Sequence, residues 1–182
     1  GLSCAYYLAV TGYRPTVFEK NEKPGKKLYI TGKGRCNVTN DCDVDEFLSN
    51  VVTNAKFLNG AIRRFPPEKF MEFLSGKTKL KTERGNRVFP LSDKASDVTK
   101  CLCAYAEEAG AEIKLNEKVL SINASDGKIV SVVTDKATYP CDNVIVCTGG
   151  LSYPSTGSTG DGYAFAKSFG HTIISPVAAL SG

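Results

Sequence analysis

The segment GLSCAYYLAVTGYRPTVFEK (Gly1–Lys20) carries the pattern that decides the fold class of this chain. Residues Leu2–Val10 are apolar and predict a helix that a glycine ends. Residues Arg14–Lys20 predict a short strand that closes on the acidic residue Glu19. In a dinucleotide-binding βαβ unit, the last glycine of GxGxxG opens the helix and an acid about 20 residues later binds a ribose hydroxyl. Gly1 and Glu19 have that spacing, although an ordinary α/β helix and strand would share it.

The ends of the sequence indicate a piece of a longer protein. A βαβ unit needs a strand before its helix, and here that strand and the first two glycines of the motif would precede residue 1. The chain has no initiator methionine, and its last residues, PVAALSG, form no closing element. We therefore expect a chain truncated at both ends.

Composition bounds the function more than it defines it. The 182 residues carry a net charge of +4, with 42% hydrophobic and 23% charged residues, as in one sizeable globular domain. We find no membrane-spanning run and no signal peptide. So mild a charge gives no broad basic face, and we expect neither nucleic acid nor membrane as a partner. The lysine-rich run Lys20–Lys27 is either a phosphate-binding loop or a solvated one.

Cysteine usage suggests a reducing compartment. The seven cysteines have irregular spacings with no CxxC pair, and the chain has one histidine, so we expect no metal site. Several lie in apolar surroundings and are typical of small core residues. We expect a cytoplasmic protein.

The middle of the chain predicts helices followed by a hairpin and a long helix. Residues Asp43–Gly76 have helical apolar spacing with loops, and a Pro-Pro pair opens the last helix. Lys79–Ser92 predicts a hairpin that turns at Gly85-Asn86. Ser92–Gly110 predicts a helix with one apolar face, and a strand, AEIKL, follows it.

The last third predicts a small β-meander and then a glycine-rich loop. Residues from about 117 to 141 predict short strands with an Asp-Gly turn at 126–127. Val144–Cys147 is apolar throughout and predicts a strand buried on both faces. A Ser/Thr/Gly-rich loop and a helix over Asp161–Gly170 follow, and His171 is predicted to begin a strand and to have a structural role.

Two loops have the composition of ligand-binding loops. In TGKGRCNVTN (Thr31–Asn40), Gly32 and Gly34 would let a ligand approach the backbone, Arg35 would pair with a pyrophosphate, and the asparagines would offer amides. In the second loop, Gly149 and Gly150 would let the backbone press on a nucleotide. The alternative for both loops is a tight turn without a ligand.

The two blocks Gly25–Asn40 and Thr148–Ile173 resemble the signature blocks of the BaiN-like flavoproteins, which are NAD(P)/FAD-dependent oxidoreductases of the aminoacetone oxidase family. The resemblance covers essentially the whole chain. It implies an α/β fold with a Rossmann-like FAD-binding domain of the two-dinucleotide-binding type, similar to glutathione reductase and fumarate reductase. It also implies FAD as cofactor and NAD(P)H as reductant.

The resemblance also assigns cofactor contacts residue by residue. Gly1 would be the last fingerprint glycine, Glu19 would hold the adenosine ribose, and the backbone of Val119 would meet adenine. Asp161 lies in TGDG, a motif similar to one in fumarate reductase flavoproteins, and is as consistent with a helix N-cap as with a ligand contact. The pyrophosphate and flavin side would be lined by Lys20, Lys27, Gly32, Gly34, Arg35, Cys36, Asn37 and Thr39, and the Ala-Thr-Gly-like motif by Thr148, Gly149 and Gly150.

The resemblance implies that part of the enzyme lies outside this chain. We expect residues 1–176 to form a partial FAD-binding domain and residues 177–182 to begin a substrate domain. We expect the piece alone to be inactive and to bind FAD weakly or not at all.

The function expected is hydride transfer between NAD(P)H and a small organic acceptor, such as an enone. No catalytic acid or base can be named, and neither the substrate nor the oligomeric state follows from the sequence. One alternative is a flavin-dependent disulfide reductase that uses Cys36 and Cys42, and another is a non-catalytic flavin-binding module.

Overall fold

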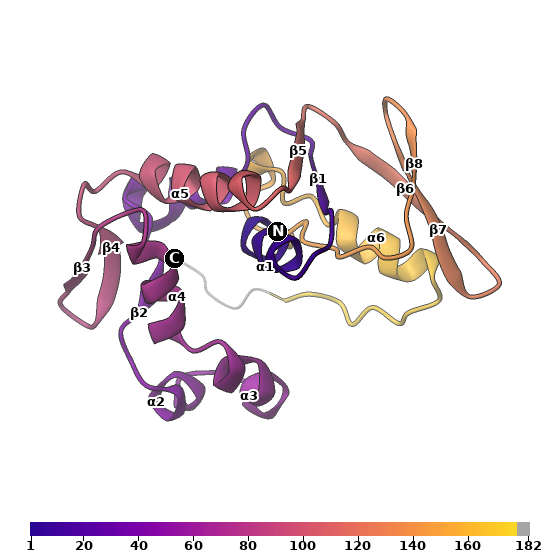
Figure 1. The fold of residues 1–182 in the computed structure, drawn as a ribbon. Helices are drawn as coiled ribbons and strands as arrows, with labels where there is room; N and C mark the ends of the chain where they lie inside the picture. Colours follow the sequence, from indigo (N-terminus) through magenta and orange to yellow (C-terminus); the bar gives the residue numbers. More distant parts are fainter. Residues whose placement is uncertain (178–182) are drawn as a thin grey trace. The chain divides into compact units, whose positions relative to one another are not determined.

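The computed structural model describes residues 1–177 (Figure 1). These residues belong to two compact units. Unit 1 comprises Gly1, Thr16–Pro24 and the chain from Ile113 onward. Unit 2 comprises Leu2–Pro15 and Gly25–Glu112. The predicted start of a further domain, residues 177–182, lies outside the described residues except for Val177.

The core of unit 2 forms around helix α5 (Ala95–Glu108). Its residues Val98, Cys101, Leu102 and Ala106 recur three or four positions apart, so they share one face, and all four are buried. Helices α1 (Leu2–Val10) and α4 (Pro67–Ser75) both contact α5. The helical spacing read from the sequence is confirmed for all three helices.

Two further helices and an antiparallel sheet complete unit 2. Helices α2 (Val44–Ser49) and α3 (Ala55–Arg64) pack on each other. The sheet has the order β2-β4-β3, from β2 (Thr39–Asn40), β4 (Arg87–Pro90) and β3 (Leu80–Glu83). The predicted hairpin turn is confirmed, because Gly85 and Asn86 both have a positive φ.

Unit 1 contains two small sheets. Strand β1 (Thr16–Glu19) pairs with β5 (Glu112–Leu115). Strands β6 (Val119–Ser125), β7 (Lys128–Thr134) and β8 (Thr138–Pro140) form the predicted antiparallel meander in sequence order. The 3-10 helix η2 (Pro154–Thr156) and helix α6 (Asp161–Ser168) follow.

Two sequence predictions are wrong in detail. Val144–Cys147 is not a strand, and Ile145 and Val146 are 56% and 47% exposed. A strand buried on both faces needs a neighbour at each edge, and none of the strands within residues 1–177 pairs with this segment. His171 is exposed and begins no strand. The segment Lys26–Gly34 is the 3-10 helix η1, broken by non-helical residues at Thr31–Lys33.

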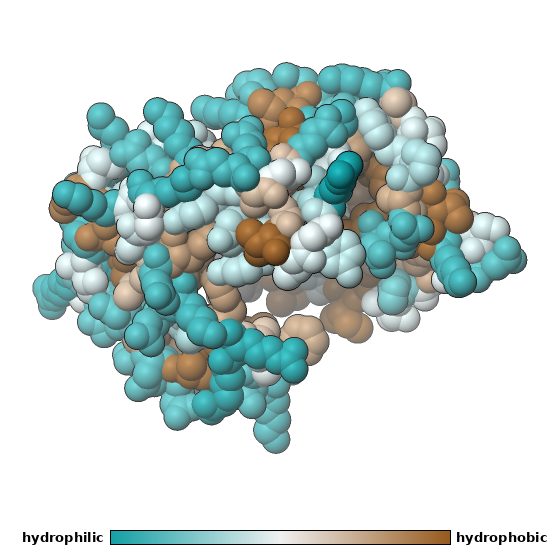
Figure 2. All heavy atoms as spheres, viewed as in Figure 1, coloured by the Kyte–Doolittle hydropathy of each residue, from teal (hydrophilic) through white to brown (hydrophobic). Residues whose placement is uncertain are grey.

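The exposed surface carries isolated hydrophobic residues. On the face drawn in Figure 2 these lie singly or in small groups among hydrophilic ones, as on most soluble domains. Within the described part of the chain, no helix combines the length and the apolar composition that crossing a bilayer requires.

Candidate functional site

In unit 1, a lysine at the end of β1 holds the start of α6. Lys20 Nζ donates to Thr159 Oγ1 at 2.6 Å and to Asp161 Oδ2 at 2.7 Å. These residues are 139 and 141 positions away in the sequence, so the pairing joins the acidic strand to the TGDG segment. We call Lys20, Thr159 and Asp161 the Lys20 cluster. Two of the predicted contact residues therefore lie together at the carboxyl end of β1.

Asp161 acts as an ion-pair partner rather than as a helix cap. Gly160, in the left-handed conformation, occupies the N-cap position, and no side chain caps α6. The hydrogen bond from Lys20 lowers the pKa of Asp161, and a second hydrogen bond from Thr159 acts in the same direction. Of the two roles left open for Asp161, the helix N-cap is therefore wrong, because Gly160 holds that position and the carboxylate pairs with Lys20.

The glycines of the second loop are explained first by close packing inside unit 1. A Cβ on Gly149 would lie 2.9 Å from Ser158 Oγ, and one on Gly157 would lie 2.8 Å from Asn21 Nδ2. The backbone N–H of Gly160 donates to the carbonyl of Gly150 at 3.2 Å. The loop at Thr148–Gly150 thus packs on the segment that leads into α6, whether or not it also contacts a ligand.

The end of β1 also meets the start of the meander. Glu19 Oε1 accepts from the Asn21 backbone N–H at 2.9 Å and from Asn21 Nδ2 at 2.6 Å. The backbone N–H of Glu117 donates to the Glu19 carbonyl at 3.0 Å. Val119, the first residue of β6, follows Glu117 by two positions, so this bond places the start of β6 near the end of β1. Gly1 lies beside Cys147, since an added Cβ would be 3.6 Å from Cys147 Cβ.

Glu117 is a buried acid that the sequence did not single out. Thr134 Oγ1 donates to Glu117 Oε1 at 2.8 Å. Burial raises the pKa of Glu117, but hydrogen bonds from Thr134 and Tyr139, with nearby lysines, outweigh it, so the pKa is lowered overall. No sequence signal distinguishes it from a surface glutamate, because its partners come from later meander strands.

In unit 2, the first loop has an unusual backbone. Gly32, Lys33, Gly34 and Cys36 all have a positive φ, between 54° and 86°. For Lys33 and Cys36 this conformation costs on the order of 1–3 kcal/mol each and persists only where the surroundings hold it. Such strain clusters at ligand-binding sites, which agrees with the predicted role of the loop.

The loop is held by the core and by strand β4. Cys36 is fully buried, and burial raises the pKa of its thiol. The Val38 backbone N–H donates to the Val88 carbonyl at 2.9 Å. With its amide oriented so that Nδ2 donates, Asn37 bonds the carbonyls of Thr39 and Val88 at 3.0 and 3.2 Å. The amide predicted to face a ligand is therefore used inside the protein.

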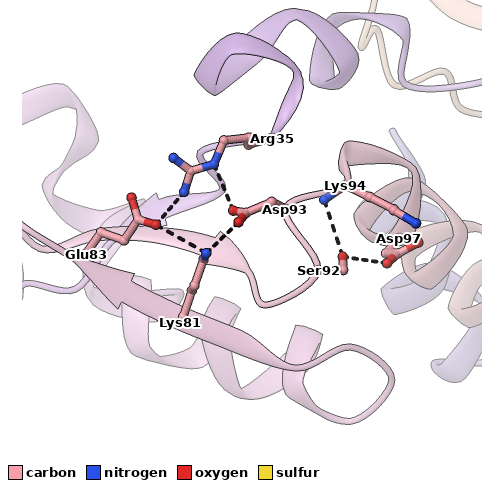
Figure 3. Close-up of polar contacts among 7 residues, drawn as sticks. All are labelled: Arg35, Lys81, Glu83, Ser92, Asp93, Lys94 and Asp97. Carbon is pink, nitrogen blue, oxygen red and sulfur yellow. Dashed lines mark hydrogen bonds and ion pairs between the residues drawn. The ribbon is translucent and has the colours of Figure 1, made fainter.

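Arg35 lies in a network of charges rather than beside an open anion site (Figure 3). Its guanidinium pairs with Glu83 and, through Nε at 2.8 Å, with Asp93 Oδ1. It also lies over the Phe89 ring, 4.2 Å from the centroid. The sequence assigned Arg35 to a pyrophosphate, but its Nε and Nη2 donate to two carboxylates of the protein itself.

Gly32 and Gly34 have different surroundings. A Cβ on Gly32 would lie 2.8 Å from Phe89 Cε1 and 2.9 Å from the Asn37 backbone nitrogen, so the close approach there is to the protein itself. At Gly34 the nearest atom, the Tyr29 carbonyl oxygen, would be 3.7 Å away. Of the two glycines, Gly34 therefore leaves more room for a ligand near its backbone.

The predicted contact residues fall into one set in each unit. Unit 1 contains Gly1, Glu19, Lys20, Val119, Thr148, Gly149, Gly150 and Asp161, and unit 2 contains Lys27, Gly32, Gly34, Arg35, Cys36, Asn37 and Thr39. Lys27 lies in η1. A cavity of about 690 Å³ in unit 2 includes Lys77, Lys79 and Lys100 in its lining and none of the predicted residues. Across residues 1–177, no cluster of His, Cys, Asp and Glu suited to a metal ion occurs.

Comparison with known proteins places the chain in a family. Residues 1–179 match the family described as "HI0933-like protein Rossmann domain". The chain is 34% identical over 186 residues to ribosomal RNA dihydrouridine synthase of Haemophilus influenzae, covering 99% of this chain and 45% of that protein. It is 32% identical over 165 residues to 3-dehydro-bile acid delta(4,6)-reductase of Clostridium scindens, covering 90% and 39%. A second ribosomal RNA dihydrouridine synthase, from Escherichia coli, is 28% identical over 181 residues, covering 99% and 44%.

The chain therefore spans less than half the length of these relatives. The resemblance to the BaiN-like flavoproteins drawn from the two loop blocks is confirmed. With a family match over nearly all its residues, the chain belongs to the HI0933-like family, and its fold is the Rossmann domain of that family.

Proposed function

We propose that the chain is the FAD-binding part of an NAD(P)H-dependent oxidoreductase that reduces a carbon–carbon double bond conjugated to a carbonyl group. The observation that carries the proposal is the gathering, in unit 1, of the β1 acid, the start of the meander and the start of α6. In open α/β folds, ligands bind at the carboxyl ends of strands, where such segments meet.

The residues of unit 1 fit the adenosine part of a dinucleotide. Glu19 ends β1, as a ribose-binding acid does, and Asn21 fixes its carboxylate through Oε1. The hydrogen bond from the Glu117 backbone N–H to the Glu19 carbonyl fixes the segment just before Val119, whose backbone would meet adenine. Lys20 and Asp161 would hold this arrangement together.

The residues of unit 2 fit the phosphate and flavin side through the backbone. Gly34 has room for close approach, and the strained run around it presents backbone dipoles rather than a side-chain cage. Lys27 would add a positive charge. Cys36, Asn37 and Thr39 would contribute through the conformation of the loop, because the Cys36 side chain is buried and the Asn37 amide is bonded internally.

The reaction balances with NAD(P)H as the reductant. NAD(P)H supplies a hydride, water supplies a proton, and the double bond gains one hydrogen at each carbon, leaving NAD(P)⁺. Bound FAD would supply the hydride-transfer chemistry. Two relatives have names that describe adding hydrogen to an unsaturated bond, in a 3-dehydro-bile acid and in ribosomal RNA uridine. This shared chemistry supports a conjugated acceptor for this chain as well.

The acceptor has two candidates. A small enone follows from the mild charge and the bile-acid reductase relative. A uridine in ribosomal RNA is supported by the 34% identity to a ribosomal RNA dihydrouridine synthase. This candidate runs against the expectation, drawn from the mild net charge, that the chain has no nucleic-acid partner. The test incubates the full-length protein with NADPH or NADH and either a 3-oxo-4-ene steroid or transcribed ribosomal RNA. A product heavier by two hydrogens identifies the acceptor class, and no reduction of either substrate contradicts the proposal.

The alternative of a dithiol mechanism has little support from the structure. Cys36 and Cys42 are free thiols, and the pKa of each is raised, chiefly by burial. A redox-active thiol instead needs a lowered pKa and access to solvent. A non-catalytic flavin module stays an alternative, which the NAD(P)H assay above separates from an enzyme.

A further inference from the structure

We propose that Arg35, Lys81, Glu83 and Asp93 form a positioning network that sets the conformation of the loop Gly32–Cys36 for FAD binding, and that Arg35 does not contact the cofactor. The inference rests on the proposed FAD-binding function. It replaces the pyrophosphate role that the sequence suggested for Arg35. We call these four residues the Arg35 network.

The geometry of the network balances the charge of Arg35 inside the protein (Figure 3). Arg35 pairs with both carboxylates, and Lys81 Nζ joins the same two, at 2.7 Å from Asp93 Oδ2 and 3.3 Å from Glu83 Oε1. Two cations face two anions, so the network is neutral. Each carboxylate is shared between Arg35 and Lys81, and such charge-assisted hydrogen bonds are among the stronger ones in proteins, so the Nε and Nη2 donors of Arg35 are held by the protein.

The network acts at the strained part of the loop. Arg35 lies between Gly34, with φ +86°, and Cys36, with φ +63°. The Cys36 side chain is buried in the core, while the Arg35 side chain reaches the carboxylates of Glu83 and Asp93. Adjacent residues thus fix the backbone from two sides. Without one of these anchors, the left-handed residues would relax toward commoner conformations.

The carboxylates are themselves fixed by regular structure. Glu83 ends β3, and Asp93 lies in the turn between β4 and α5, where its backbone N–H donates to the Pro90 carbonyl at 3.0 Å. In the same turn, Ser92 Oγ donates to Asp97 Oδ2 of α5 at 2.6 Å (Figure 3). The hairpin and the start of α5 thereby set where the guanidinium lies.

A loop held in its binding conformation for only a fraction of the time binds with an affinity reduced by that fraction. We therefore expect the double substitution Glu83→Gln/Asp93→Asn to weaken FAD binding about tenfold or more, although neither residue meets FAD. Arg35→Gln should have a similar effect, and Arg35→Lys should restore part of the affinity, since lysine keeps the charge but not the fork. The triple variant Arg35→Gln/Glu83→Gln/Asp93→Asn should bind FAD only slightly more weakly than Arg35→Gln alone, because the three substitutions disrupt the same network and their effects do not add.

The experiment titrates FAD into apo full-length protein and follows flavin fluorescence, with thermal unfolding of each apo variant measured in parallel. Asp45→Asn is the matched control, because it breaks the exposed Arg63–Asp45 pair elsewhere in unit 2. If Glu83→Gln/Asp93→Asn binds FAD as well as or better than wild type while Arg35→Gln binds worse, Arg35 contacts the cofactor and the inference is wrong. If the double variant does not fold, Asp93→Asn alone replaces it, and its affinity for FAD should lie between those expected for wild type and for the double variant. Wild-type protein that binds no FAD would refute the proposed function and the inference together, whereas unaffected variants of an FAD-binding wild type would refute the inference alone.

Discussion

At the scale of single residues, Gly32 shows why glycine is required in the first loop. Its φ is +54°, and an added Cβ would lie 2.8 Å from the Phe89 ring and 2.9 Å from the Asn37 backbone nitrogen. Neither neighbour is the free end of a flexible chain. The residue is therefore constrained by both its backbone conformation and its packing.

We expect Gly32→Ala to lower the free energy of unfolding by about 2–4 kcal/mol, combining left-handed strain with overpacking. Gly85→Ala is the matched control, since Gly85 also has a positive φ, +77°, but no atom lies within 4 Å of its added Cβ. It should cost only about 1–2 kcal/mol. Urea unfolding of the full-length variants measures both, and equal losses would show that packing at Gly32 contributes nothing.

The Lys20–Asp161 pair predicts a defined pH dependence. Because Lys20 lowers the pKa of Asp161 in the folded protein, the pair stabilises the fold above the unfolded pKa, about 3.9, and the contribution is lost as pH falls through the lower folded pKa. The stability difference between wild type and Asp161→Asn should thus be constant from about pH 7 to 5 and shrink below about pH 4. In a Lys20→Gln background the difference should be smaller throughout. A difference that grows on acidification would contradict the assigned pairing.

At the scale of elements, the buried contact between α4 and α5 stabilises unit 2. Leu74, at the end of α4, is fully buried, and its carbonyl accepts a weak hydrogen bond from Cys101 Sγ of α5 at 3.7 Å. Leu74→Ala should cost about 2–5 kcal/mol, because it leaves a cavity in this contact. The neighbouring exposed residue gives the control: Ser75→Ala should change stability by less than about 0.5 kcal/mol. Thermal or urea unfolding that finds the two variants alike would contradict the assigned core.

The elements predicted correctly are those whose pattern is local. The apolar face of α5 recurs at helical spacing, and the Gly85-Asn86 and Asp126-Gly127 turns have their own backbone signature. The strand predicted at Val144–Cys147 was wrong, because strand formation depends on pairing with neighbouring strands as well as on the residues of the segment. Composition alone therefore could not decide that segment.

Candidate site residues could be chosen from the sequence, but their partners within the protein could not. Lys20 and Asp161 were both chosen from the sequence, but not their pairing across 141 positions. Glu83, Asp93 and Glu117 were missed, because their importance depends on where the hairpin and the meander fold. Arg35 was chosen for its charge, which the sequence cannot show to be neutralised by two carboxylates.

At the scale of the whole molecule, the chain comprises two compact units, each with its own set of predicted contact residues. The family match covers residues 1–179, and the relatives are more than twice as long as this chain. We therefore propose that the full-length protein is an FAD enzyme reduced by NAD(P)H.

The visible absorption spectrum of the purified full-length protein, recorded before and after anaerobic addition of NADPH or NADH, tests that claim most directly. We predict flavin bands in the oxidised protein that bleach when one of the two nucleotides is added. A colourless protein that also fails to take up added FAD would contradict the account.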